Sequence, residues 1–156
     1  MTHPDAYPIQ NLMLIDDNSF DQMIYQRISQ KSGMVGNLMQ FTDATKALEH
    51  LADTGKVRPD LILLDINMPI MDGFEFLEAV TEKFGADMCP IVVMLTTSLN
   101  PKDELRAKGF SVVEDFLNKP LTKAHLEKLS ELVNGHKKQV PFNDTAKAQT
   151  EQVVSK

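Results

Sequence analysis

The chain has 156 residues, about the size of one ordinary domain. Its 16 basic and 22 acidic side chains give a net charge of −6, which argues against a general nucleic-acid binder or a protein held on anionic membranes, because both need a basic face. Cys89 is the only cysteine, which excludes an internal disulfide and a cysteine-rich zinc site. The N-terminus has no basic and apolar leader and no apolar run is long enough to span a bilayer, so we expect a cytoplasmic protein without membrane contact.

Short apolar runs recur along the chain at intervals that suit strands. Several are apolar nearly throughout, as in parallel strands whose two faces are both covered. The expected strands are residues 12–15, 38–41, 61–64, 91–95 and 112–117.

Between these runs, apolar residues recur with the helical spacing i, i+3, i+4, i+7. The apolar stripes consist of Phe20, Met23, Ile24 and Ile28; Ala44, Ala47, Leu48 and Leu51; Gly73, Phe76, Leu77 and Val80; and Leu126, Leu129 and Val133. Candidate N-caps are Asp43, Asn100 and Thr122, and Pro101 suits a first helical position. Asn18 and Asp21 are predicted to set the start of the first helix.

Five strands alternating with five helices predict an α/β fold, a doubly wound parallel sheet with right-handed crossovers. We expect one domain over residues 9–135. Residues 136–156 are polar and weakly periodic, so we expect them to form a disordered tail.

Four of the predicted strands end in polar residues. Asp16 and Asp17 follow the first strand and Asp65 the third, while Thr96 and Lys119 end the fourth and fifth. A single acidic residue at a strand end is more often a helix cap or a solvated loop residue. The whole set points elsewhere, because the carboxyl ends of parallel strands share one edge of the sheet, where these residues would converge.

The charges of this set predict a metal site. Three carboxylates repel one another unless a cation lies among them, and their charge of −3 is balanced by a divalent cation together with Lys119. Oxygen ligands with no histidine or cysteine favour Mg²⁺ over zinc. Asp65, beside a metal, a lysine and the Thr96 hydroxyl, could act as a nucleophile toward a phosphoryl group, since a carboxylate is already ionised at neutral pH.

The motifs at these strand ends resemble those of bacterial response-regulator receiver domains, of the chemotaxis-regulator-like, single-domain type. The resemblance extends over residues 11–134 and rests on Asp16-Asp17, Leu63-Leu64-Asp65-Ile66-Asn67-Met68-Pro69-Ile70-Met71-Asp72-Gly73, Leu95-Thr96-Thr97-Ser98 and Phe116-Leu117-Asn118-Lys119-Pro120. It implies a flavodoxin-like sheet with strand order 2-1-3-4-5. It also implies a cis peptide bond between Lys119 and Pro120.

The resemblance assigns a role to each matching residue. Asp65 corresponds to the phosphoacceptor, and Thr96 and Lys119 to the residues that contact the phosphoryl oxygens. Asp17 would bind Mg²⁺ directly, Asp16 mainly through water, and Asn67 through its backbone carbonyl. Phe116 corresponds to the aromatic residue that switches together with the Thr96 hydroxyl.

The implied function is a signalling module that catalyses only its own phosphorylation and dephosphorylation. The phosphoryl group would come from a histidine kinase or a histidine phosphotransfer protein. Only 22 residues follow residue 134, so we expect a stand-alone receiver with no direct DNA binding that acts through a protein partner. It could bind a target through its fourth helix, fifth strand and fifth helix, relay phosphate, or drain phosphate from a kinase.

Two other classes fit the residues less well. A haloacid-dehalogenase-like phosphatase needs a second aspartate two positions after the nucleophile, where this chain has Asn67. Such a phosphatase would also need a cap domain, for which this chain has no room. A nucleotide-binding α/β protein needs a phosphate loop, and the glycines form neither common loop pattern.

Overall fold

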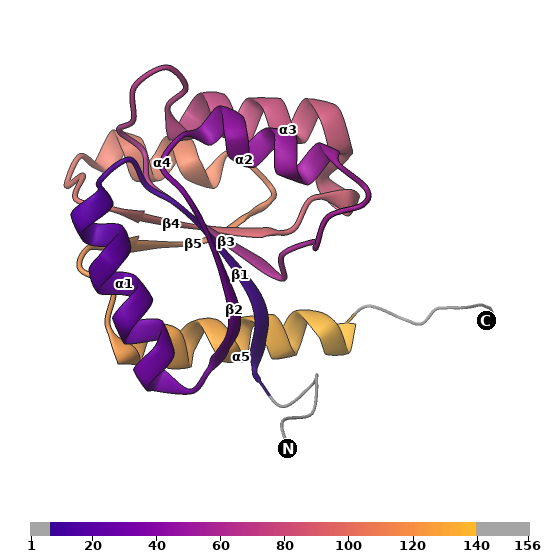
Figure 1. The fold of residues 1–156 in the computed structure, drawn as a ribbon. Coiled ribbons are helices and arrows are strands. Elements are labelled where there is room, and N and C mark those ends of the chain that lie inside the picture. The colour runs from indigo at the N-terminus through magenta and orange to yellow at the C-terminus, as the bar shows by residue number, and fades with distance from the viewer. Residues whose placement is uncertain (1–6, 140–156) are drawn as a thin grey trace.

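The computed structural model describes residues 7–139, which form five strands and five helices in strict alternation (Figure 1). In chain order the elements are β1 (Ile9–Ile15), α1 (Ser19–Ser32), β2 (Val35–Phe41), α2 (Ala44–Ala52), β3 (Leu61–Leu64), α3 (Gly73–Met88), β4 (Ile91–Thr96), α4 (Pro101–Lys108), β5 (Val113–Asn118) and α5 (Lys123–Gln139). The strands are all parallel and lie in the order β2-β1-β3-β4-β5. The predicted fold class and strand order are therefore confirmed.

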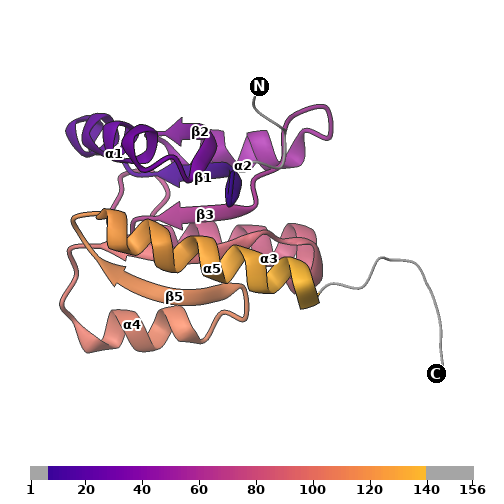
Figure 2. The ribbon, with the colours of Figure 1, turned by 90° about the horizontal axis from the view of Figure 1, so that it is seen from below.

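Helices cover both faces of the sheet. Figure 1 shows α2, α3 and α4 on one side and α1 and α5 on the other, and Figure 2 shows α1 and α5 from below. Each face has its own apolar core, because successive strand residues point to opposite faces. Ile62 and Leu64 belong to the core under α2 and α3, whereas Leu61 and Leu63 belong to the core over α5. Burial on both faces explains why β3 and β4 are apolar nearly throughout.

The three predicted caps each accept a hydrogen bond at the start of a helix, and at α5 Thr122 Oγ1 accepts one from His125 N–H (3.1 Å). The Asp43 side chain accepts a hydrogen bond from the Thr45 N–H at the start of α2, and the Asn100 side chain accepts one from Lys102 N–H at the start of α4. Pro101 occupies the first turn of α4, as predicted. Asn18 is the N-cap of α1, where its side chain accepts a hydrogen bond from the Asp21 N–H.

The predicted apolar stripe of α1 was partly wrong. Phe20 and Met23 are 62% and 43% exposed, and the buried positions of this helix are Gln22, Tyr25 and Ser29. Ile24 and Ile28 do pack against the core. The polar Gln22 can be buried because its side-chain amide donates hydrogen bonds to backbone carbonyls of β1 and β2, which an apolarity pattern does not register.

The domain boundary predicted after residue 135 lies close to the end of the last helix. Helix α5 continues to Gln139, so the boundary expected after residue 135 falls inside a helix. Of the predicted tail, residues 140–156 lie outside the described residues. Over residues 7–139, no helix is long and apolar enough to cross a membrane.

Candidate functional site at the carboxyl ends of the strands

The backbones of the strand-end residues are held by the sheet itself. The ladder of hydrogen bonds continues past the strands: Asp16 N–H donates to Phe41 O (3.0 Å), and Asp65 N–H to Ile15 O (3.0 Å). Lys119 N–H donates likewise to Thr96 O (2.9 Å), and the Lys119–Pro120 peptide bond is cis, as the family resemblance implied. The predicted residues therefore meet at one edge, on backbone that the sheet makes rigid.

Gly73 allows the start of α3 to pack directly on the strand end that carries Asp65. Its N–H donates to Ile66 O (2.8 Å), and a Cβ at this position would lie 2.5 Å from the carbonyl oxygen of Asp65. No side chain fits in that space without moving the backbone. Gly73, which looked like a member of an apolar stripe, is thus a close-approach position that helps to set the conformation around Asp65.

Three carboxylates converge at this edge. One oxygen from each of Asp16, Asp17 and Asp65 lies within 4.8 Å of the others. Asp16 and Asp65 are buried, whereas Asp17 is exposed. Oδ1 of Asp65 accepts a hydrogen bond from Ile66 N–H (2.8 Å), and its Oδ2 lies against Lys119. The arrangement is the all-oxygen cluster that the sequence predicted.

Asp16 carries a buried charge that is incompletely satisfied. Its Oδ1 accepts a hydrogen bond from Asn18 N–H (2.9 Å). Its Oδ2 lies 2.7 Å from Lys119 Nζ, but the geometry is that of an ion pair, and no hydrogen-bond donor is directed at this buried oxygen. Burial raises the pKa of Asp16 above its ordinary value of 3.8, although Lys119 and the Asn18 N–H act in the opposite direction. A cation beside Oδ2 would compensate this charge.

The Lys119 ammonium joins the acidic residues together. Its side chain is 9% exposed, and Nζ lies 3.0 Å from Asp65 Oδ2 and 3.1 Å from Asp21 Oδ2, in addition to its contact with Asp16. Burial alone would lower the pKa of Lys119, but the hydrogen bonds and charges of the surrounding carboxylates outweigh burial and raise it. Lys119 is therefore a fixed cation beside the oxygen of Asp65.

The other predicted residues surround this centre. Thr96 is fully buried at the end of β4, and its Oγ1 accepts a hydrogen bond from Ser98 N–H (3.2 Å). Phe116 is half-buried on β5 and packs against the core beneath α3 and α4. Asn67 is exposed two residues after Asp65, and the role of its backbone carbonyl as a metal ligand stays a prediction.

Two polar residues of α1 also belong to the site, and the sequence analysis did not assign either of them a role in it. Asp21, which the sequence suggested could add to the polarity of the pocket but more simply sets the start of the helix, forms the ion pair with Lys119. The Gln22 side-chain amide donates to Asp16 O (3.0 Å) and to Phe41 O (2.9 Å), and so fixes the backbone that carries Asp16. The available signal was a glutamine flanked by apolar residues on a helix directly after the acidic pair.

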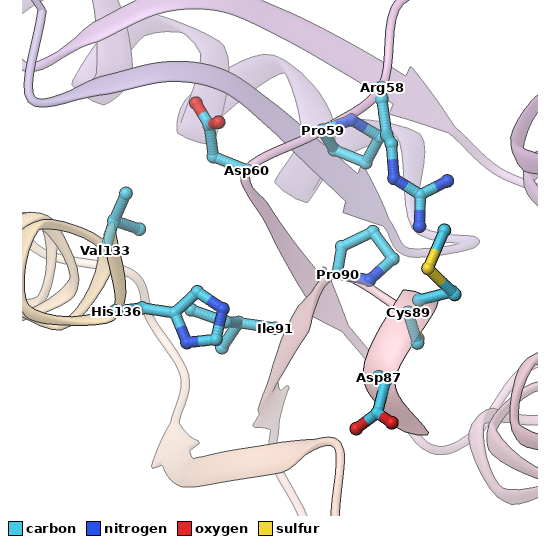
Figure 3. Close-up of a pocket in the computed structure, with 10 residues that line it drawn as sticks. Arg58, Pro59, Asp60, Asp87, Cys89, Pro90, Ile91, Val133 and His136 are labelled. Carbon is cyan, nitrogen blue, oxygen red and sulfur yellow. The ribbon is translucent and has the colours of Figure 1, made fainter. Parts of the chain in front are cut away.

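A cavity of about 260 Å³ lies at the opposite, amino-terminal end of the strands (Figure 3). It is bordered by Asp60 before β3, Cys89 and Pro90 before β4, and His136 on α5. Asp60 Oδ2 already accepts a hydrogen bond from Asn11 N–H (3.0 Å), and burial raises the pKa of the Cys89 thiol to about 11. This cavity is separated from the acidic cluster by the length of the sheet, so it does not contribute to the site.

Known proteins are similar to this chain in both sequence and fold. Response regulator Rcp1 from Synechocystis is 31% identical over 136 residues, which span 84% of this chain and 88% of Rcp1. The crystal structure of a two-component response regulator from Cytophaga hutchinsonii matches with a TM-score of 0.75 and 28% identity over 81% of this chain and 98% of that chain. The Mn²⁺-bound form of Rcp1 matches with a TM-score of 0.62 and 27% identity over 89% and 99% of the two chains.

The sequence model of the response regulator receiver domain matches residues 12–131, which include every residue of the acidic cluster, Thr96, Phe116 and Lys119. Domains of this family are signalling modules of two-component systems. The chain belongs to the response regulator receiver domain family.

Proposed function

We propose that this protein accepts a phosphoryl group on Asp65 from a histidine kinase or a histidine phosphotransfer protein, in a reaction that needs Mg²⁺. The observation that supports this most is the convergence of a fixed lysine and two further carboxylates on the Asp65 side chain. Together they form a pocket in which the negative charge of a phosphoryl group can be compensated.

The cluster fits a divalent cation held by oxygen. The exposed Asp17, the carboxylate of Asp65 and the backbone carbonyl of Asn67 would hold it directly, and the buried Asp16 mainly through water. The buried Oδ2 of Asp16 supports this fit, because it accepts no hydrogen bond and shares its neighbouring cation, Lys119, with Asp21 and Asp65. When bound, the metal would offset the charge of the incoming phosphoryl oxygens.

The chemical step is a displacement at phosphorus. An ionised carboxylate oxygen of Asp65 forms the new P–O bond while the P–N bond to the donor imidazole breaks, and the electron pair remains on that nitrogen, which takes a proton from solvent. Lys119 is placed to donate a hydrogen bond to a phosphoryl oxygen. The protein would in this sense catalyse its own phosphorylation, and the later hydrolysis of the acyl phosphate.

The signal would pass from Thr96 to α4. To reach a phosphoryl oxygen, the Thr96 hydroxyl must leave the Ser98 N–H, and the Ser98 hydroxyl in turn donates to Asp103 Oδ2 (2.5 Å) in the first turn of α4. Phe116, packed on the same side of the sheet, would move into the space that Thr96 vacates. A pull on Thr96 would therefore change the face formed by α4, β5 and α5.

This face offers apolar surface to a protein partner. Leu99 and Leu105 are 86% and 73% exposed, before and within α4. We expect phosphorylation to change the binding of a downstream protein target here, without direct DNA binding.

Intact-mass spectrometry tests the proposed reaction. Incubation with acetyl phosphate and Mg²⁺ should add one phosphoryl group, which Asp65→Asn or removal of Mg²⁺ with EDTA should abolish. Asp115→Asn is a matched control, because this half-buried carboxylate on β5 is paired with Lys128 outside the cluster. An adduct that persists in Asp65→Asn would refute the assignment of the phosphoacceptor.

A further inference from the structure

We infer that Asp21 is a positioning residue that holds Lys119 toward α1 and thereby weakens the binding of a phosphoryl group at Asp65. The inference rests on the proposed function, because it concerns the same lysine. It arises from a contact across 98 positions of the chain: Lys119 Nζ donates a hydrogen bond to Asp21 Oδ2 at 3.1 Å.

Asp21 occupies a helix position whose usual task it does not perform. It is the third residue of α1, where an acidic side chain commonly accepts a hydrogen bond from the N-cap backbone. Helix α3 shows that arrangement, with Glu75 Oε1 accepting from Asp72 N–H at 2.9 Å. In α1 the N–H of the N-cap Asn18 is donated to Asp16 Oδ1 instead, which leaves the Asp21 carboxylate to pair with Lys119.

The pairing places Asp21 in competition with a phosphoryl group. An ammonium has three N–H donors. Lys119 donates to Asp21 and to Asp65, and Asp16 Oδ2 lies 2.7 Å from the same nitrogen. A phosphoryl oxygen on Asp65 must share the ammonium with these three carboxylates, and the hydrogen bond to Asp21 holds that ammonium toward α1. Without Asp21, Lys119 could turn fully toward the phosphoryl group.

Charge acts in the same direction. Asp16, Asp17, Asp21 and Asp65 carry −4, while Lys119 and a divalent cation supply +3, so the loaded pocket has a net charge of −1 before any phosphoryl group arrives. Neutralising Asp21 brings the pocket to zero, which favours an anion and disfavours a cation. Removing the charge of Asp21 should therefore strengthen the binding of a phosphoryl group and weaken the binding of Mg²⁺.

The opposite signs of these two effects distinguish positioning from a merely structural role. In Asp21→Asn, isothermal titration should show Mg²⁺ binding weakened by about threefold to fivefold, as expected for loss of a partly exposed charge. At saturating Mg²⁺, the phosphoryl mimic fluoroberyllate should bind more tightly by a similar factor. Asp21→Glu should restore wild-type values, and Glu82→Gln, which removes one exposed carboxylate on α3, should change neither constant.

The outcomes separate this inference from the proposed function. If the wild-type protein does not bind fluoroberyllate in the presence of Mg²⁺, the proposed function fails. If it does bind, but Asp21→Asn leaves both affinities unchanged or weakens both, Asp21 does not compete for Lys119. Asp21→Ala provides a second variant, and thermal unfolding of each protein identifies an effect that comes from loss of folding.

Discussion

Replacing Asp16 by asparagine should stabilise the metal-free protein, although it removes an ion pair. The charge of Asp16 is repelled by Asp17 and Asp65, whose nearest oxygens lie within 4.8 Å, and attracted by Lys119 at 2.7 Å. With an effective dielectric constant of about 20, each repulsion costs about 3.5 kcal/mol and the attraction contributes about 6 kcal/mol. These contributions nearly cancel, so the cost of burying the charge decides the sign.

The raised pKa of Asp16 agrees with the conclusion that the cost of burial decides the sign. Burial is the largest influence on this group and raises its pKa, so the folded protein holds the ionised carboxylate less favourably than the unfolded chain does. We expect Asp16→Asn to raise the free energy of unfolding at pH 7 by about 1 kcal/mol, measured by urea denaturation in EDTA.

The effect should depend on pH with a definite sign. A raised pKa means that the folded state binds the proton more readily, so the penalty from ionised Asp16 is absent near its ordinary pKa of 3.8 and below. The penalty grows as the pH rises through the folded-state pKa. The increase in the free energy of unfolding caused by Asp16→Asn should therefore be smaller at pH 4 than at pH 7.

In the presence of Mg²⁺ the wild-type protein should become more stable than Asp16→Asn, the reverse of their order in EDTA. At about one hundred times its dissociation constant, a ligand that binds only the folded state adds about 2.7 kcal/mol to its stability. The wild-type protein should gain this stability, and Asp16→Asn should lose most of it. A lower stability of Asp16→Asn in EDTA at pH 7 would refute the reasoning, because the attraction to Lys119 would then outweigh repulsion and burial.

Three further predictions concern the surrounding structure. Gly73→Ala should lower the free energy of unfolding by about 2 kcal/mol, because the new Cβ would lie 2.5 Å from Asp65 O. Gly135→Ala, in open space within α5, should raise the free energy of unfolding by about 0.5–1 kcal/mol. Chemical denaturation of both variants measures the two changes. Ile70 is 83% exposed with φ of 69°, so Ile70→Asn should raise the stability by about 1 kcal/mol, and an unchanged or lower midpoint would show that the backbone there is not strained. The raised pKa of Cys89, about 11, keeps the thiol protonated at pH 7, so iodoacetamide should label it much more slowly in the folded protein than in urea, and equal rates would contradict its burial.

The sequence was sufficient to predict where the principal site residues meet. Apolar runs that alternate with helical periods specify parallel strands, and parallel strands bring their carboxyl ends to one edge. The pair Asp16-Asp17 and the single Asp65 directly follow apolar runs, so their convergence could be inferred without coordinates. The motifs around Asp65 and Lys119 were equally sufficient to predict the family.

Only the tertiary structure determined how the site is supported. The face that α1 buries depends on Gln22, whose partner Phe41 O lies 19 residues away. The side chain of Asp21 is paired with Lys119, 98 residues away. Gly73 could be distinguished from a helix residue only by the proximity of Asp65 O. Periodicity reports how often a side chain is apolar, but a polar side chain is buried or exposed according to the hydrogen-bond partners that distant segments bring to it.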